Sequence, residues 1–127
     1  MRMKYLLFVA AGGAAGAVSR YLLGAWVHGL WSGPWPVGTL CVNVAGSAAI
    51  GAIYVLLERG GLHPDWRSVL VVGFLGAFTT FSTFSLETVE LWQRGEPVTA
   101  AAYALASTTG CVAAAAGAIA LLRSLSV

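Results

Sequence analysis

The sequence predicts an all-α integral membrane protein, built as a single four-helix transmembrane domain over residues 1–127. Of the 127 residues, 58% are hydrophobic and only 9% are charged, and the mean hydropathy is +0.80. In a soluble domain about 25% of the residues are charged. A chain with so few charges could not cover its surface for water, so we expect most of that surface to face lipid.

Four apolar stretches are long enough to span a bilayer as helices, which takes about 20 residues each. They cover residues 5–30, 37–57, 68–92 and 98–122. The links between them are short and contain Gly and Pro, as turns do. The Trp residues lie near the ends of the stretches, where an interfacial aromatic belt is expected: Trp26, Trp31, Trp35, Trp66 and Trp92. We therefore expect no separate soluble domain.

The first stretch resembles a signal peptide only at its start, where Arg2 and Lys4 precede apolar residues. The apolar region of a signal peptide is about 7–15 residues long, whereas this one continues to Leu30. We therefore expect it to remain in the mature protein as the first span.

Small residues recur at four-residue spacing, which predicts helices that approach closely in lipid. The pairs are Gly12 and Gly16, Ser47 and Gly51, and Ala113 and Gly117. This pattern predicts a tightly packed bundle that forms an oligomer.

The charge pattern bears on orientation and on partners. The net charge is only +2 and the basic residues are scattered, so no nucleic-acid partner is expected. With both termini on one face, that face carries five basic residues and the opposite loops carry only Arg94. The five are Arg2, Lys4, Arg59, Arg67 and Arg123. The positive-inside rule then predicts cytoplasmic termini.

Two cysteines, Cys41 and Cys111, lie inside apolar stretches. Such thiols behave as small hydrophobic side chains, and two of them form neither a disulfide framework nor a metal site. We expect neither cysteine to be needed for activity.

Polar residues inside a span need a partner or a water-filled cavity. Asn43 is the only carboxamide of the second span; its two N–H donors could join helices or meet an anion. In the third span, five hydroxyls fall within seven residues, after Gly73 and Gly76. They are Thr79, Thr80, Ser82, Thr83 and Ser85. This run is a poor helix former, so it predicts a break that lines a pathway.

Aromatic rings and two ionisable groups accompany the hydroxyl run. Phe81 and Phe84 share a helical face, and the positive edges of such rings could stabilise a small anion. Arg20 lies ~22 Å along a hydrocarbon core ~30 Å thick, where it either reaches the far interface or forms a positive pore mouth. Glu87 either pairs with a base or accepts hydrogen bonds from hydroxyls. In the last span, Tyr103 is followed at four-residue steps by Ser107 and Cys111, giving a lightly polar stripe.

These residues together resemble the Fluc/CrcB family of fluoride channels, over nearly the whole chain. The matching segments are GGAAGAVSRY at 12–21, GTLCVNVAG at 38–46 and GFLGAFTTFSTFS at 73–85, followed by Glu87. The third segment is highly specific, whereas the glycine-rich first segment would be weak alone.

The resemblance implies an antiparallel, dual-topology homodimer with two pores, a broken third helix and a structural sodium ion (Na⁺) at the dimer interface. By position, the main-chain carbonyls of Gly76 and Thr79 would hold the sodium. The residues implied for the fluoride pore are Arg20, Asn43, Phe81, Ser82, Thr83, Phe84, Tyr103 and Ser107. At Cys111 we expect a serine in some relatives.

The implied function is a passive, highly selective channel, not an enzyme, which exports fluoride across the cell (plasma or inner) membrane and confers fluoride resistance. Neutral HF enters cells, ionises in the more alkaline cytoplasm and is trapped as the anion. Uncharged donors can replace the water of fluoride without holding the ion too tightly for conduction. The charge bias argues for one fixed orientation, so an oppositely oriented paralogue is the alternative to a homodimer.

Two other functions agree with the hydropathy pattern. A small drug/proton antiporter is also a short four-span class, but it needs a central carboxylate, and the first span has none. Insensitivity of transport to a proton gradient would separate the two. A non-transporting membrane subunit would leave the hydroxyl run unexplained.

Overall fold

The computed structural model describes residues 2–125, so residues 1, 126 and 127 of the expected domain lie outside the described range. Three long helices are α1 (Met3–Gly29), α2 (Val37–Glu58) and α5 (Pro97–Ser124). The remaining span consists of η1 (Arg67–Leu75), α3 (Gly76–Phe78) and α4 (Phe81–Gln93). Residues 2–125 contain no strand. The all-α prediction is therefore confirmed.

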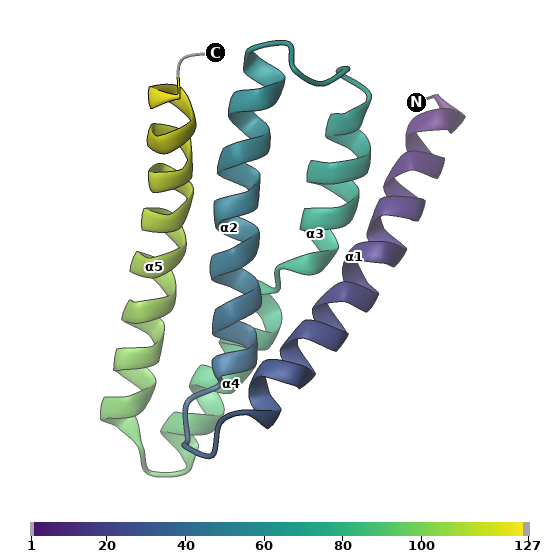
Figure 1. Ribbon diagram of the computed structural model, residues 1–127. Helices are drawn as coiled ribbons and strands as arrows, with labels where there is room; N and C mark the ends of the chain where they lie inside the picture. The colour runs from purple at the N-terminus through teal and green to yellow at the C-terminus, as the bar shows by residue number, and fades with distance from the viewer. Residues whose placement is uncertain (1, 126–127) are drawn as a thin grey trace.

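Four helical segments are long and apolar enough to cross a membrane: Met3–Gly29, Val37–Glu58, Arg67–Gln93 and Pro97–Ser124. Each begins and ends within two residues of the range expected from the sequence. In Figure 1, α1 begins and α5 ends at the same end of the bundle, as an even number of crossings requires.

The turns form as their glycines predict. Gly60 and Gly95 adopt the left-handed region, with φ of 73° and 80°. After α2, the Gly61 N–H donates to the carbonyl of Leu56 at 2.8 Å, and after α4 the Glu96 N–H donates to Leu91 at 3.0 Å. Such bonds are typical of helices that end at a glycine. They satisfy carbonyls in the last turn that have no N–H donor within the helix.

Glycines allow the closest helix contacts, as their spacing predicted. The α1 helix packs mainly on η1, and α2 packs mainly on α5. A Cβ on Gly16 would collide with the backbone of Phe74, and one on Gly51 would lie 2.5 Å from the Ala115 carbonyl. By contrast, a Cβ on Gly117 would meet nothing within 4 Å. Gly117 therefore does not serve packing within this chain.

The buried core is small and divided in two. One cluster contains Val42, Leu75 and Phe78, and the other contains Leu91, Ala100 and Tyr103. Large apolar side chains are exposed on every long helix, which suits a surface that faces lipid or another chain.

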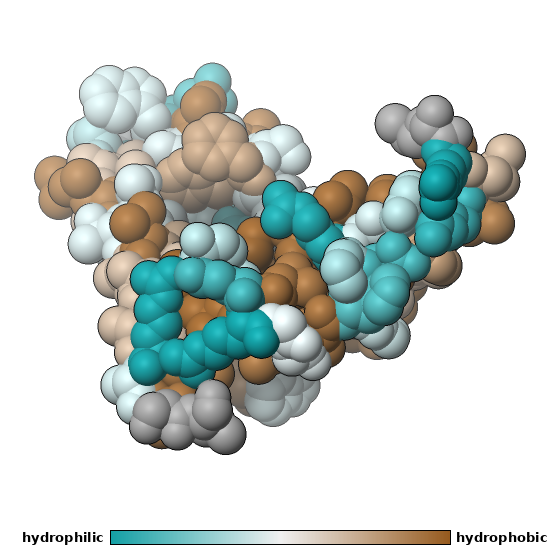
Figure 2. Space-filling view, turned by 90° about the horizontal axis from the view of Figure 1, so that it is seen from above, coloured by the Kyte–Doolittle hydropathy of each residue, from teal (hydrophilic) through white to brown (hydrophobic). Residues whose placement is uncertain are grey.

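Polar residues gather at the end where α1 begins and α5 ends. Seen from above in Figure 2, hydrophilic groups are separated there by hydrophobic residues. In one group, Arg59 donates to the carbonyls of Leu122 at 2.9 Å and Arg123 at 3.0 Å, and Arg123 pairs with Glu58 at 2.8 Å. Arg59 thereby satisfies carbonyls at the end of α5 that lack helical donors.

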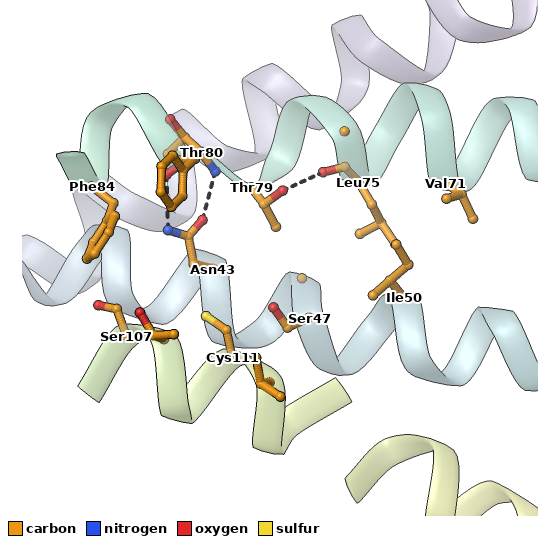
Figure 3. Close-up of a pocket in the computed structure, with 15 residues that line it drawn as sticks. Asn43, Ser47, Ile50, Val71, Leu75, Thr79, Thr80, Phe84, Ser107 and Cys111 are labelled. Carbon is orange, nitrogen blue, oxygen red and sulfur yellow. Dashed lines mark hydrogen bonds between the residues drawn. The ribbon is translucent and has the colours of Figure 1, made fainter. Parts of the chain in front are cut away.

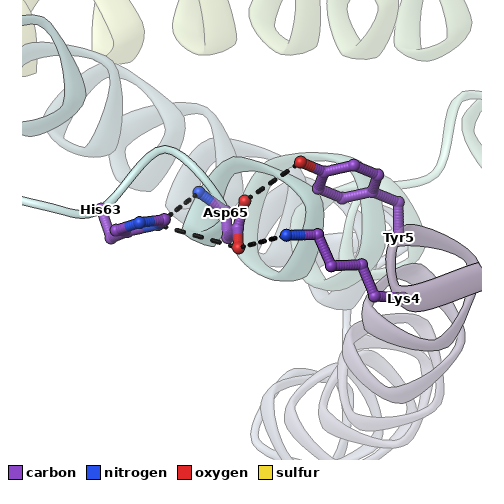
Figure 4. Close-up of polar contacts among 4 residues, drawn as sticks. All are labelled: Lys4, Tyr5, His63 and Asp65. Carbon is purple, nitrogen blue, oxygen red and sulfur yellow. Dashed lines mark hydrogen bonds and ion pairs between the residues drawn. The ribbon is translucent and has the colours of Figure 1, made fainter. Parts of the chain in front are cut away.

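The second polar group joins α1 to the loop before η1 (Figure 4). Asp65 accepts hydrogen bonds from Lys4 at 3.2 Å and from the Tyr5 hydroxyl at 3.3 Å, and its own N–H donates to His63 Nδ1. Loss of hydration alone would raise the pKa of the Asp65 carboxyl, but these hydrogen bonds and the Lys4 charge hold that pKa below its usual range.

The third span is broken at the expected place. Thr79 (φ −86°, ψ 156°) and Thr80 (φ −148°, ψ 109°) are extended between α3 and α4. The nine residues before α3 form a π-helix, η1, which the sequence reasoning did not anticipate. Single π turns are common at functional sites, and a whole π segment directly precedes this break.

Candidate functional site

The break diverts backbone donors away from two particular carbonyls. In a continuous α-helix, the carbonyl of residue i accepts from the N–H of residue i+4. The Thr80 N–H instead donates to Asn43 Oδ1 at 2.7 Å, and the Thr83 N–H donates to Thr80 Oγ1 at 3.2 Å. The carbonyls of Gly76 and Thr79, the two predicted sodium ligands, are thus without their helical donors.

Asn43 bridges α2 and the break with two hydrogen bonds. Its Oδ1 accepts from the Thr80 N–H, and its Nδ2 donates to the Thr80 carbonyl at 3.1 Å. This is the interhelical bonding that the sequence left as one alternative. The amide carries a second N–H, which takes no part in the Thr80 pair.

The hydroxyl run divides into two sets. Thr79 and Ser85 donate to the carbonyls four residues before them, at 3.0 and 2.8 Å. Thr80 instead caps the start of α4 and donates to Thr83 Oγ1 at 3.0 Å, with Ser82 Oγ at 3.3 Å. Thr80, Ser82 and Thr83 form a hydroxyl cluster at the N-terminus of α4, where a helix favours anions.

An uncharged cavity of about 390 Å³ lies beside the break, which we call the inner cavity (Figure 3). None of the described residues that line it is Asp, Glu, Lys, Arg or His. The predicted residues that it brings together are Asn43, Gly76, Thr79, Phe81, Phe84 and Ser107. They come from α2, α3, the break, α4 and α5.

A second cavity of about 340 Å³, the vestibule, carries charge. Its lining includes Arg20, His28 and Glu87, together with the hydroxyls of Thr39 and Thr83. Arg20 Nε donates to the Ala77 carbonyl at 3.0 Å, so its guanidinium is fixed next to the break. Arg20 thus lies in the wall of the vestibule.

Thr80 lines both the inner cavity and the vestibule. Its backbone is held by Asn43, so the break lies next to both spaces.

Glu87 accepts hydrogen bonds from two hydroxyls, which decides between its two predicted roles. Thr39 donates to Oε2 at 2.9 Å and Tyr103 donates to Oε1 at 3.0 Å. Tyr103 is fully buried, and its ring lies against Phe84 with 5.3 Å between centroids. The carboxylate therefore ties α4 to α2 and α5.

Within residues 2–125, Ser107 has a hydroxyl without a hydrogen-bond partner, and Phe81 has an exposed ring. Among the described residues, Ser107 Oγ is the one buried side-chain polar atom with no hydrogen-bond partner, on a residue only 5% exposed. Phe81 is 78% exposed, although its ring centroid lies 5.4 Å from that of Phe84. The lining of the inner cavity thus includes a residue with an unpaired hydroxyl and a ring that this chain does not cover.

Two predicted pore residues, Ser82 and Tyr103, line neither cavity. Ser82 contacts the lining residue Thr80, and Tyr103 contacts the lining residues Glu87 and Phe84. Sequence reasoning missed His28 and the role of Thr39. Thr39 lies four residues before Asn43, so helical spacing could have placed it on the same face.

Comparison with known proteins identifies the family. The family model described as CrcB-like protein, Camphor Resistance (CrcB), matches residues 7–119. A relative from Hahella chejuensis, named fluoride-specific ion channel FluC, is 47% identical over 124 residues, covering 97% of this chain and 98% of the relative.

Two further relatives carry the same name. One, from Nitrobacter winogradskyi, is 47% identical over 125 residues, covering 97% of this chain and 98% of its own length. Another, from Shewanella amazonensis, is 47% identical over 110 residues, covering 87% and 89%. The chain, with its four membrane-spanning helices, therefore belongs to the CrcB family of multi-pass membrane proteins.

Proposed function

We propose that this protein is a passive fluoride channel of the cell membrane and not an enzyme. The observation that carries the proposal is the position of Thr80, at the break, between a charged vestibule and an uncharged cavity. The name of the relatives, fluoride-specific ion channel, supplies the ion.

Apart from Arg20, the donors along this route are neutral. Arg20 supplies a positive charge to the vestibule, which also contains Glu87. Thr83 offers a hydroxyl donor at the start of α4, because the Thr80 hydroxyl already donates to Thr83 Oγ1. Beyond the break, Asn43 and Ser107 line the inner cavity, and the second N–H of Asn43 and the Ser107 hydroxyl are the donors that we assign to it. Such donors replace water around a small, strongly hydrated anion, yet they hold it weakly enough for release.

The rings complete the wall, and one of them suggests a second chain. The positive edges of Phe81 and Phe84 suit a small anion. A ring that is 78% exposed is expected to gain cover from another subunit. This arrangement supports an antiparallel homodimer with one pore for each chain; the alternative partner is an oppositely oriented paralogue.

A structural sodium ion fits the carbonyls at the break. Gly76 and Thr79 present main-chain oxygens whose helical donors are diverted to Asn43 and Thr80, and unwound carbonyls commonly coordinate Na⁺ in membrane proteins. These two residues of each chain would hold the ion at the dimer interface, where it would supply a central positive charge.

The physiological direction follows from acid chemistry. HF enters as a neutral molecule and leaves fluoride in the more alkaline cytoplasm. A passive path then lets an inside-negative membrane potential drive the anion outward, which would confer fluoride resistance.

Fluoride efflux from liposomes containing the purified protein tests this function. Fluoride should leave the liposomes once its counter-ion can also cross the membrane, whereas chloride should stay inside. A proton gradient should have no effect on the rate of fluoride efflux. Equal chloride efflux would overturn the selectivity. Transport that depends on the proton gradient would instead favour the antiporter interpretation.

A further inference from the structure

A histidine, His28, lies in the wall of the vestibule near the end of α1. Arg20, Gly24 and His28 all line this cavity, and they follow one another at four-residue steps, so they form one stripe along the helix. His28 lies about 12 Å beyond Arg20 along the helix axis, toward the end of the bundle opposite to both termini (Figure 1). Because Arg20 is bonded next to the break, His28 is the basic side chain of the vestibule that lies farther from the break.

The fixed charges of the vestibule cancel when His28 is neutral. Among the described residues of its lining, Arg20 carries one positive charge and Glu87, when ionised, carries one negative charge. Tyr21 contributes an uncharged phenol. A proton on His28 adds a second positive charge, so the sum changes from zero to one positive charge. The protonation state of His28 therefore sets the net charge of this cavity.

The neighbouring helices add no other charge to the vestibule lining. The α1 helix packs on α2, η1 and α3; the lining residues from α2 are uncharged, and none comes from η1 or α3. On α4, Glu90 pairs with Arg94 at 3.7 Å, and neither residue lines the vestibule. On α5, the Tyr103 hydroxyl donates to Glu87. The interaction of His28 with charge in this cavity is thus limited to Arg20 and Glu87.

His28 is accessible to protons from water. Its side chain is exposed, and the ion pairs within residues 2–125 do not include it. Histidine is the side chain whose charge ordinarily changes between about pH 5 and 8. A positive charge in a cleft raises the local concentration of anions and their rate of entry.

We propose that His28 is a further residue of the fluoride pathway, which attracts the anion into the vestibule when it is protonated. Fluoride flux then rises as the pH at the vestibule falls. Acid also increases the share of neutral HF, so the pathway would conduct best when most fluoride enters the cell. This inference rests on the proposed function, because it concerns the entry of the same ion.

His63 provides a matched control, because the chain contains only two histidines. It is also exposed, but it lies in the loop before η1, where its Nδ1 accepts from the Asp65 N–H at 3.1 Å. It lines neither the inner cavity nor the vestibule. A general effect of acid on histidines or on lipid would not depend on which histidine is replaced. An effect through the vestibule requires His28 alone.

The first experiment measures fluoride efflux from liposomes that contain the parent, His28→Gln, His28→Lys or His63→Gln. The pH is equal on both sides and is varied from about 8 to about 5.5, at a low fluoride concentration so that entry of the ion limits the rate. Protein-free liposomes give the HF leak at each pH, which is subtracted. Size-exclusion chromatography checks that each variant assembles like the parent.

Flux through the parent and His63→Gln should be at least about threefold higher at the acid end of this range. His28→Gln should keep the lower flux at every pH, and His28→Lys should keep the higher flux, because lysine is charged throughout. A pH response that persists in His28→Gln would assign the proton to Glu87 or to another group and would overturn the inference. Parent flux that falls in acid would overturn it as well.

A titration by nuclear magnetic resonance gives a readout that is independent of transport. With isotope-labelled histidine, the two rings can be followed separately, and His63→Gln assigns their signals. Replacing gluconate by fluoride at equal ionic strength should raise the pH at which half of His28 is protonated, because a nearby anion favours the charged ring. His63 should titrate alike in both salts.

Equal titration of His28 in the two salts would contradict its contact with the anion. If the parent carries no fluoride at any pH, the proposed function fails. The titration still decides, in that case, whether an anion in the vestibule meets His28.

Discussion

Asn43 on α2 holds both backbone polar groups of Thr80, accepting from its N–H at 2.7 Å and donating to its carbonyl at 3.1 Å. A break in the middle of a membrane span leaves backbone groups that lipid cannot satisfy. One side chain on a neighbouring helix satisfies two of them here. The Asn43–Thr80 pair is therefore a structural condition for the break as well as part of the proposed pathway.

The substitution Asn43→Asp tests both roles. A carboxylate could still accept from the Thr80 N–H, but it would face the Thr80 carbonyl without a proton and would repel an anion in a medium of low dielectric. We expect fluoride flux to fall at least tenfold, which requires only about 1.4 kcal/mol of additional barrier. Efflux from liposomes measures this, with size-exclusion chromatography as the control for assembly. A variant that conducts like the parent would restrict Asn43 to packing.

Ser107→Ala separates stability from transport. Because Ser107 Oγ has no partner, removing it deletes an unsatisfied buried group, and stability should be unchanged or higher. Fluoride flux should nevertheless decrease, since the inner cavity loses a donor. The control is Thr109→Ala, a residue that is exposed and lines neither cavity. A Ser107→Ala variant with lower thermal stability and unchanged flux would show a structural hydroxyl instead.

Gly16→Ala tests the contact between α1 and η1. The added methyl group would meet the backbone of Phe74, which cannot rotate away. Overpacking of this kind typically costs about 1–3 kcal/mol, so the melting temperature in detergent should fall. Gly117→Ala is the matched control, because nothing lies within 4 Å of its Cβ position; its melting temperature should not decrease. Equal behaviour of the two variants would contradict the close packing at Gly16.

Asp65→Asn tests the polar group at the end where α1 begins. The folded pKa of Asp65 lies below its usual value, so its contribution to stability is fully present above the unfolded pKa of about 3.9. It is lost as the pH falls through the lower, folded pKa. The parent should thus be more stable than Asp65→Asn at pH 7, and the difference should vanish in acid. Melting temperatures between pH 2 and 7 measure this difference. A difference that grows in acid would contradict the lowered pKa of Asp65.

The proposed sodium site predicts a bound ion that survives purification. After exhaustive dialysis against sodium-free potassium buffer, atomic emission should still detect about one sodium for each pair of chains, since a buried ion held by carbonyls exchanges only when the pair opens. Thermal stability should fall if the protein is unfolded and reassembled without sodium. Sodium at the level of the dialysis buffer would contradict the site.

Local features of the sequence determined the four spans and the break. Length and hydropathy alone predict helices in lipid, because every backbone group must be satisfied within the span. The run from Gly73 to Ser85 weakens a helix through its own glycines and hydroxyls, and the extended residues Thr79 and Thr80 follow from that weakness. The glycines at 60 and 95 likewise predicted the turns that they form.

Only the tertiary structure decided which partner each polar group found. Asn43 meets a backbone 37 residues away, and Glu87 meets Thr39 and Tyr103 across two helices. The side chains on a helix have a fixed angular position, but the rotation of one helix against another depends on contacts along their whole length. The unpaired Ser107 hydroxyl, the exposed ring of Phe81 and the cavity around Cys111 are results of that packing. No local pattern encodes them, because each depends on atoms contributed by another part of the chain.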